Sequence, residues 1–392
     1  MNTPKIRFKG FEDDWEQRKV SDITNSYSGG TPKSGTSEYY DGNIPFIRSG
    51  EIYSDKTELF ISELGMNYSS AKRVHIGDIL YALYGATSGE VSRAKLDGAI
   101  NQAILAIIPN QDINADFLVE WFRKEKDKII NTYLQGGQGN LSAQIIKELV
   151  VMIPSKEEQY KLGNYFTYIN RLITLHQRKC DETKQLKKFM LQKMFPKNGE
   201  KNPEIRFEGF TDDWEQRKLG DVFKEYSEKH HEELPALTIV QGGGTIFREE
   251  SDRSLQYDKS NLSGYKMVKK DDFIVHLRSF EGGLEKANSD GIISPAYHTM
   301  HGDNVDSRFY YPYFRSYDFI NRKLVAHVYG IRDGRSIDID GMKSIEIPYT
   351  SYEEQKTIGD YLDSLDHLIT LHQRKCEKLK ELKKFMLQNM FV

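Results

Sequence analysis

DDWEQRK occupies Asp13–Lys19, and the same seven letters return at Asp212–Lys218. The match extends on both sides, because IRFKGFEDDWEQRKVSDI (6–23) aligns with IRFEGFTDDWEQRKLGDV (205–222). The string itself carries no obvious catalytic chemistry. Its recurrence half a chain length later is therefore the observation that decides how the sequence is organised.

A second shared stretch closes each half. LITLHQRKC at 172–180 returns at 368–376, and KKFMLQ at 187–192 returns at 383–388. The opening matches are offset by 199 residues and the closing matches by 196. Matches of this length at nearly one spacing indicate a tandem duplication with a period of about 200 residues.

The stretches between the shared ends diverge but keep a common scaffold. The aligned blocks are GDILYALYGATSGE (77–90) with DDFIVHLRSFEGGLE (271–285), DGAINQA (97–103) with DGIISPA (290–296), and residues 134–154 with 328–348. Constant ends and a shared scaffold with variable residues indicate one fold that occurs twice, with different recognition residues in each copy.

Composition narrows the class of protein. A chain of 392 residues predicts two or three domains, and a mean hydropathy of -0.63 predicts a soluble protein. We expect no membrane span and no secretory signal, and two cysteines fit a reducing cytoplasm. The net charge of -3 is not that of a generally basic nucleic-acid binder. Any DNA contact would need local basic patches or a partner that neutralises phosphates.

Short apolar runs bounded by Gly, Asp and Pro predict strands. The runs are DILYALY (78–84), AILAIIP (103–109), LVVMIP (149–154), DFIVHLR (272–278) and SIEIP (344–348). Helices are expected at 116–130 and, in the second half, at 311–324. The fold class is therefore α+β, with two mixed α/β domains.

The closing segments predict long helices. Apolar residues recur at helical spacing at Leu162, Phe166, Ile169, Ile173, Leu186, Met190 and Met194, and at Ile358, Leu362, Leu365, Ile369, Leu379, Leu382, Met386 and Met390. About 38 residues make a rod of roughly 57 Å with a narrow stripe that needs a partner. The simplest partner is the other rod, antiparallel, which would put the two variable domains at opposite ends of a spacer. The alternative is that each helix packs on its own domain.

This pattern gives four expected segments. They are a first variable domain at 1–153, a first helix at 154–199, a second variable domain at 200–347 and a second helix at 348–392.

Catalytic motifs are weak. NIPF at 43–46 is similar to the Asn-Pro-Pro-Phe tetrad of amino-methyltransferases, but a strand entry explains it better, because no methyl-donor glycine loop accompanies it. Glycine-rich stretches at 136–140 and 241–245 lack the Gly-Lys-Ser/Thr of a phosphate loop and predict turns. His230, His231, His298 and His301 are expected in solvated positions rather than on a metal. The sequence thus predicts no enzyme by itself.

The whole chain resembles the specificity subunit of type I restriction–modification systems. The resemblance rests on both WEQRK openings, IPFIRSGEI (44–52), the EEQ helix entries and the LITLHQRKC and KKFMLQ helix segments. It implies two target-recognition domains that read a split site on double-stranded DNA. It also implies helices that act as a spacer and dock two methyltransferase subunits, with restriction–translocase subunits beyond them. S-adenosylmethionine, ATP and Mg would be bound by those partners, and none by this chain.

Loop residues able to contact bases or phosphates are the DNA-binding candidates. They are Thr31, Lys33, Arg48, Ser49, Tyr84, Gln138 and Asn140 in the first half, and Gln241, Arg248, Arg253, Arg278, Arg332 and Arg335 in the second. Tyr84 and Arg278 occupy one scaffold position with different chemistry, as two different half-sites would require.

Repeated residues are the docking candidates. They are Trp15, Arg18, Trp214, Arg217, His176, Arg178, His372 and Arg374. The tryptophans would anchor each domain either to its helix or to a methyltransferase. Two other functions stay open: a stand-alone DNA-binding regulator with pseudo-two-fold symmetry, and an interaction scaffold that binds proteins.

Overall fold

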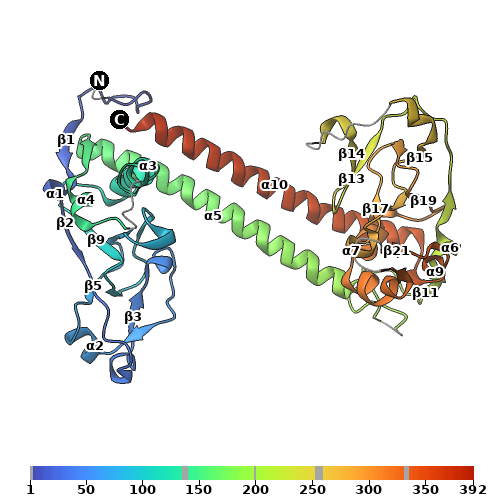
Figure 1. Ribbon diagram of the computed structural model, residues 1–392, viewed down its shortest axis with the longest axis horizontal. Helices are drawn as coiled ribbons and strands as arrows, with labels where there is room; N and C mark the ends of the chain where they lie inside the picture. The colour runs from blue at the N-terminus through green and yellow to red at the C-terminus, as the bar shows by residue number, and fades with distance from the viewer. Residues whose placement is uncertain (1–2, 135–139, 198–199, 252–258, 331–334) are drawn as a thin grey trace. The chain divides into compact units, whose positions relative to one another are not determined.

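The computed structural model describes residues 3–134, 140–197, 200–251, 259–330 and 335–392. The chain divides into two compact units (Figure 1). Unit 1 comprises residues 1–177 with 373–392, and unit 2 comprises residues 178–372. Each unit therefore contains one variable domain, the first part of the helix that follows it, and the last part of the other long helix. No described helix is long and apolar enough to cross a membrane.

Unit 1 is built on two four-stranded sheets with strand orders β2-β9-β6-β7 and β4-β3-β8-β5. Pairing is antiparallel except between β3 and β8. The strands are β2 Thr24–Ser28, β9 Ile104–Pro109, β6 Ile79–Ala82, β7 Val91–Arg93, β4 Phe60–Ile61, β3 Ile44–Ile47, β8 Gly98–Ile100 and β5 Lys72–Val74. Short helical segments connect them: α1 Val20–Ile23, η1 Ser37–Tyr39, η2 Ser49–Glu51, α2 Glu63–Asn67, η3 Gly85–Thr87 and α4 Ala143–Glu148.

Unit 2 repeats the first of these sheets with the order β12-β19-β16-β17. Three separate two-stranded pairs, β13–β14, β15–β18 and β20–β21, surround it. The strands are β12 Lys224–Tyr226, β19 His298–His301, β16 Phe273–Val275, β17 Glu285–Lys286, β13 Leu237–Val240, β14 Gly244–Phe247, β15 Lys266–Val268, β18 Gly291–Ile293, β20 Val328–Tyr329 and β21 Ser336–Ile337. The short helices are α6 Leu219–Val222, η4 Arg248–Glu250, η5 Lys259–Gly264, α7 Ser279–Gly282 and α9 Ile339–Lys343. The expected strands at 78–84, 103–109, 149–154, 272–278 and 344–348 are confirmed.

The repeated EQRK letters form equivalent edge pairings in the two units. Strand β1 (Glu16–Lys19) pairs antiparallel with β10 (Val150–Ile153), the strand that precedes the first long helix. Strand β11 (Glu215–Lys218) pairs in the same way with β22 (Glu346–Tyr349). The repeated segment at the start of each half thus fixes the strand that leads into that half's long helix.

A buried ion pair joins the same two repeated segments. Arg7 donates to both carboxylate oxygens of Glu158 at 2.7 and 2.8 Å, and Arg206 does the same to Glu354 at 2.7 and 2.9 Å. Both carboxylates are almost fully buried. A buried carboxylate is tolerated when a bidentate guanidinium compensates its charge, so the IRF opening and the EEQ helix entry depend on one another.

The expected helix at 116–130 is confirmed as α3 (Ala115–Tyr133). Its counterpart at 311–324 is wrong as a single helix. Helix α8 (Ser307–Phe314) ends before Arg315, and a π-helical turn (η6, Phe319–Lys323) and a 3-10 turn (η7, Leu324–His327) follow. The buried aromatic residues Phe314 and Phe319 are five positions apart, which a continuous α-helix does not bring to one face.

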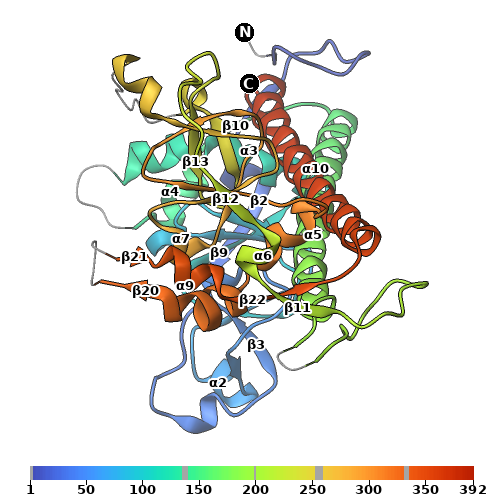
Figure 2. The same ribbon diagram turned by 90° about the vertical axis from the view of Figure 1, so that its right-hand side faces the viewer.

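The two long helices are α5 (Lys156–Lys193) and α10 (Tyr352–Met390), of 38 and 39 residues. They lie side by side in both views (Figure 1, Figure 2). In unit 1 the Cys376 thiol lies 4.0 Å from the Ile173 carbonyl oxygen, and in unit 2 the Cys180 thiol lies 4.0 Å from that of Ile369. The antiparallel pairing is confirmed in each unit.

Each helix also packs on its own domain, so the expected alternatives coexist. Leu162 and Phe166 of α5 belong to the core of unit 1, and Ile358 and Leu362 of α10 belong to the core of unit 2. Two positions of the expected stripe are wrong: Leu186 and Leu382 are exposed. They lie on the outer face of the helix pair. The contact between α5 and α10 is narrow and accommodates fewer apolar residues per turn than the helical spacing predicted.

The aromatic core of each unit is closed by the end of the other half's helix. In unit 1, Phe391 at the end of α10 lies 6.3 Å from Trp15, 5.3 Å from Phe117 and 5.7 Å from Phe166, between ring centroids. In unit 2, Phe195 just after α5 lies 6.1 Å from Trp214, 4.9 Å from Phe309 and 5.5 Å from Tyr313. Each variable domain therefore needs the helix of the other half to complete its core.

Candidate nucleic-acid interface

The loop that carries Thr31 and Lys33 is anchored by its glycines. A Cβ atom on Gly29 would lie 1.8 Å from the Ile100 carbonyl oxygen, so only glycine lets the chain pass here. The Tyr40 hydroxyl then donates to the Pro32 carbonyl at 2.7 Å. Thr31 and Lys33, on either side of Pro32, are exposed, and the Thr31 hydroxyl donates to Gln102 Oε1 at 2.7 Å. The loop thus presents two polar side chains from a fixed backbone.

Arg48 is held by carboxylates of its own domain. Its guanidinium lies 2.9 Å from Glu51 Oε1 and 2.7 Å from Glu58 Oε2. The Arg48 hydrogen bonds outweigh burial and lower the pKa of Glu51 to about 2, so this carboxylate is ionised at neutral pH. Ser49 follows at the start of η2 and is half-buried. A DNA phosphate would have to compete with both carboxylates for Arg48.

Tyr84 and Asn140 are brought together. They form an isolated antiparallel bridge, and the Leu141 amide donates to the Leu83 carbonyl at 3.0 Å beside it. Tyr84 immediately precedes η3, the turn that α7 replaces in unit 2. Gln138 lies outside the described residues. Within unit 1 the candidates therefore lie in separate loops, with only Tyr84 and Asn140 paired.

Three second-half candidates meet around the short helix α7. Arg278 precedes it and is exposed. The Arg335 guanidinium lies 4.5 Å above the ring centroid of Phe280 in α7, and Gln241 covers Gly282 so closely that a Cβ there would lie 2.3 Å from Gln241 Nε2. Two arginines and one glutamine are the side chains best suited to reading base edges in the major groove.

The remaining second-half candidates do not join this group. Arg248 lies just after β14, where its guanidinium is 5.4 Å from the ring centroid of Tyr265. Arg253 and Arg332 lie outside the described residues.

The docking candidates separate into buried and exposed residues. Trp15 and Trp214 are only 2% and 3% exposed. Both indoles contact the aromatic residue at the end of the other half's helix, and the Trp214 indole N–H also donates to Glu354 of α10 at 3.0 Å. A partner cannot touch them directly in this conformation.

Arginines dominate the exposed part of this set. Arg217 lies 3.7 Å above the ring centroid of Tyr349 and 2.7 Å from Glu215 Oε2, and Arg18 lies 3.7 Å from Glu16 Oε2. On the long helices Arg178 and Arg374 are exposed, whereas His176 and His372 are half-buried. Among the docking candidates, the four arginines are therefore the exposed residues.

Sequence reasoning missed a repeated apolar surface. Leu186 and Phe189 of α5 are exposed in unit 2, and the equivalent Leu382 and Phe385 of α10 are exposed in unit 1. Phe189 is 48% and Phe385 54% exposed. The signal was the KKFMLQ repeat itself, whose phenylalanine is not part of the buried stripe. We call these residues the LxxF surfaces. Because the same exposed apolar pair recurs at equivalent positions of both helices, these residues are candidates for contact with another molecule.

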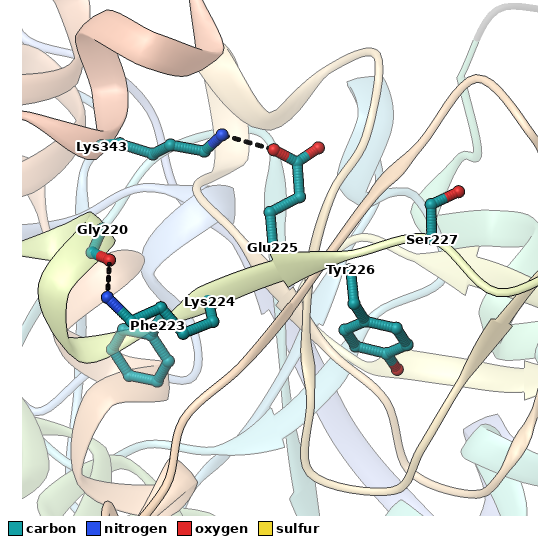
Figure 3. A pocket seen from close by; sticks show the side chains of 7 residues that line it. All are labelled: Gly220, Phe223, Lys224, Glu225, Tyr226, Ser227 and Lys343. Atoms are coloured by element: carbon teal, nitrogen blue, oxygen red, sulfur yellow. Dashed lines mark hydrogen bonds and ion pairs between the residues drawn. The ribbon is translucent and has the colours of Figure 1, made fainter.

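No enzymatic constellation appears among the described residues. A surface pocket of about 450 Å³ in unit 2 is lined by Lys224, Glu225, Lys343 and neighbours (Figure 3). Lys343 forms an ion pair with Glu225, and the Lys224 ammonium donates to the Gly220 carbonyl at 2.8 Å. These three side chains therefore have partners within the pocket wall.

The weak motifs have structural roles. NIPF enters strand β3, as expected, and the stretch 241–245 forms the turn between β13 and β14 together with the start of β14. Three of the four candidate histidines pair with carboxylates: His231 with Glu233, His298 with Glu225 and His301 with Asp272. No group of three or more potential metal ligands occurs in the described part of the chain.

A mixed α/β fold that occurs twice, with equivalent sheets and different polar loops, defines a class of tandem recognition proteins. A family model for the type I restriction modification DNA specificity domain matches residues 12–185 and again 211–381. The chain belongs to this family. It is a DNA specificity subunit that works within a complex, and catalysis belongs to the other subunits.

Individual relatives agree with this assignment. The MjaVIII specificity subunit of Methanocaldococcus jannaschii is 23% identical over 95% of this chain and 91% of its own length. The MjaIX specificity subunit of the same organism is 29% identical over 54% of this chain, and that match spans about half of the relative, 52%. The crystal structure of an S subunit from M. genitalium shares the fold with a TM-score of 0.64 at 14% identity, over 100% of this chain and 99% of that one.

Proposed function

We propose that this chain reads a split site on double-stranded DNA, one half-site for each variable domain. Residues 1–153 and 200–347 are the recognition domains. Residues 154–199 and 348–392 form the helices that set the spacing and dock the partners. The observation that carries the proposal is the repeated sheet, whose order β2-β9-β6-β7 returns as β12-β19-β16-β17. Equivalent loops on this sheet carry different side chains, as Tyr84 and Arg278 do.

The second domain reads its half-site mainly with the residues around α7. Arg278 and Arg335 suit guanine and Gln241 suits adenine, because these side chains match the donor–acceptor patterns of those bases. In the first domain Thr31, Lys33 and Ser49 contact phosphates, while Tyr84 and Asn140 face the bases. Arg48, Arg248, Gln138, Arg253 and Arg332 complete the proposed DNA-facing set.

The helices dock two methyltransferase subunits through the LxxF surfaces. The same apolar pair occurs once at the end of α5 and once at the end of α10, so two identical partners find the same contact. Exposed arginines near the helix centres, Arg178 and Arg374, and on the repeated strands, Arg18 and Arg217, extend these surfaces. Restriction–translocase subunits join the complex through the methyltransferases. S-adenosylmethionine, ATP and Mg are bound by the partners, and the complex acts in the cytoplasm.

DNA binding is expected to depend on the partners. A net charge of -3 does not supply the cationic surface that phosphate neutralisation requires, so the methyltransferases must provide much of it. We expect the purified chain alone to bind its target DNA at least tenfold more weakly than the chain with methyltransferase, in a mobility-shift titration at one fixed salt concentration. Tight, sequence-specific binding by the isolated chain would favour the stand-alone regulator instead.

A further inference from the structure

Glu285 is a buried carboxylate whose surroundings are fully organised. It lies in β17, at the edge of the four-stranded sheet of unit 2, and its side chain is 0% exposed. An ionised carboxylate in such a position must be compensated by donors or by an opposite charge. Its contacts therefore show what it holds in place.

Four groups donate to this carboxylate. The amides of Gly242 and Gly244 donate to separate oxygens, at 2.8 and 3.1 Å. The Tyr311 hydroxyl donates at 2.7 Å, and the Arg315 guanidinium forms an ion pair. Tyr311 belongs to α8 and Arg315 directly follows it. Glu285 thus links the turn between β13 and β14 to the end of α8.

The turn that Glu285 holds has one defined conformation. Gly242 and Gly244 have φ of +82° and +74°, and a Cβ on Gly244 would lie 2.5 Å from the Lys286 carbonyl oxygen. From the other side, Asn288 Nδ2 donates to the Gly243 and Thr245 carbonyls at 2.7 and 2.9 Å. The turn is therefore fixed before any ligand arrives, which lowers the entropy cost of binding.

The side chain that this turn presents is Gln241. It directly precedes the glycines, is exposed, and lies over Gly282 of α7. The turn below it sets its position, because its side-chain amide forms no hydrogen bond with any residue that the structure describes. A displacement of the turn would move Gln241 away from the neighbouring Arg278 and Arg335.

Unit 1 contains a related carboxylate. Glu90, just before β7, accepts hydrogen bonds from Tyr53, which follows η2, and from Lys126 of α3. The strand register shifts the end of the alignment between the blocks 77–90 and 271–285 by two residues. Leu80 and Ile274 are equivalent, and Glu285 lies opposite Ile274, whereas Ser92 and not Glu90 lies opposite Leu80. Glu90 is two residues before Ser92 and so on the same face of the strand. Both domains therefore tie a variable loop to the following helix through a carboxylate on this face.

We propose that Glu285 is a positioning residue for DNA recognition, which fixes the turn at 241–244 so that Gln241 meets a base edge. Glu285 itself does not touch DNA. The inference rests on the proposed function, because it requires the second domain to read a half-site. It adds a specificity-determining residue that lies beneath the recognition surface.

The test uses the complete complex and methylation mapping with Glu285→Gln, Gln241→Ala and the double variant. Glutamine keeps the shape, but its NH₂ group faces an amide donor and its charge no longer balances Arg315. We expect methylation at sites altered at one position of one half-site to rise roughly tenfold, the discrimination that one bidentate base contact supplies. Gln241→Ala should relax the same position, and the double variant should be no worse than Gln241→Ala alone, because Glu285 acts through Gln241.

Two further variants guard against a trivial loss of folding. Asn288→Ala removes the other support of the turn from an exposed position and should relax the same letter. Glu225→Gln removes a carboxylate at the opposite edge of the same sheet and should leave the motif intact.

Additive effects of Glu285→Gln and Gln241→Ala would overturn the inference. So would an Asn288→Ala complex with an unchanged motif, or a uniform loss of methylation that leaves every letter of the motif unchanged. Absence of any split motif with the unaltered chain would instead contradict the proposed function.

Discussion

Replacing Phe391 by alanine should lower the free energy of unfolding of unit 1 by about 3–5 kcal/mol. The ring lies between Trp15, Phe117 and Phe166 and is only 3% exposed. Its removal leaves a cavity in a core formed by residues from opposite ends of the chain. The loss can be measured by urea unfolding followed by tryptophan fluorescence, because Trp15 and Trp121 both belong to unit 1.

Phe385 supplies the matched control for this prediction. It lies on α10, six residues before Phe391, but is exposed, so Phe385→Ala should change stability by only about 0.5 kcal/mol. Phe195→Ala is the equivalent core variant in unit 2, where Trp214 reports. Equal effects of Phe391→Ala and Phe385→Ala would mean that the end of α10 does not close the core of unit 1.

Aspartate at both LxxF surfaces should abolish binding of the methyltransferase subunits. An aspartate at Phe189 or Phe385 places a charge in the centre of an apolar contact, where desolvation without a partner costs several kcal/mol and reduces affinity at least a hundredfold. Phe189→Asp and Phe385→Asp should each reduce the complex from two methyltransferase subunits to one, and the double variant should bind none. Native mass spectrometry of the copurified complex counts the subunits.

Tyr168→Asp is the control for the docking variants. Tyr168 is an exposed aromatic residue of α5 that is not repeated, because Ser364 occupies the equivalent position of α10. This variant should keep both methyltransferase subunits. If the double phenylalanine variant retained two subunits as well, the LxxF surfaces would not be the docking sites.

The repeat organisation could be predicted because it rests on local pattern. The apolar spacing from Leu162 onward predicts a long helix whatever surrounds it, and the second copy shows that the helix has an equivalent partner. The recurrence of DDWEQRK predicts equivalent contacts with two identical partners. In the structure, part of this repeated segment instead contacts its own half of the chain. EQRK pairs with the strand before the long helix, and Arg7 binds Glu158. Both partners of that ion pair stand in repeated segments, which was a signal that they meet.

The recognition surface could be predicted only residue by residue. Gln241, Arg278 and Arg335 come from three distant loops, and their convergence on α7 depends on tertiary packing that no local periodicity encodes. Glu285 was aligned with Glu90 by letter alone, because a sequence match cannot detect a shift of two residues in strand register. The break after Phe314 was missed because the aromatic residues around it are compatible with either a helix or tight turns. Leu186 and Leu382 satisfied helical spacing, although the pair of helices has no room for them in its seam.

In the proposed function, this chain directs a methyltransferase to its target sequence on DNA. Single-molecule mapping of methylated DNA, from cells that carry the methyltransferase gene with and without the gene for this chain, tests it most directly. We expect N6-methyladenine at one split motif, and only in cells that carry the gene for this chain. Identical methylation patterns in the two cell lines would contradict it.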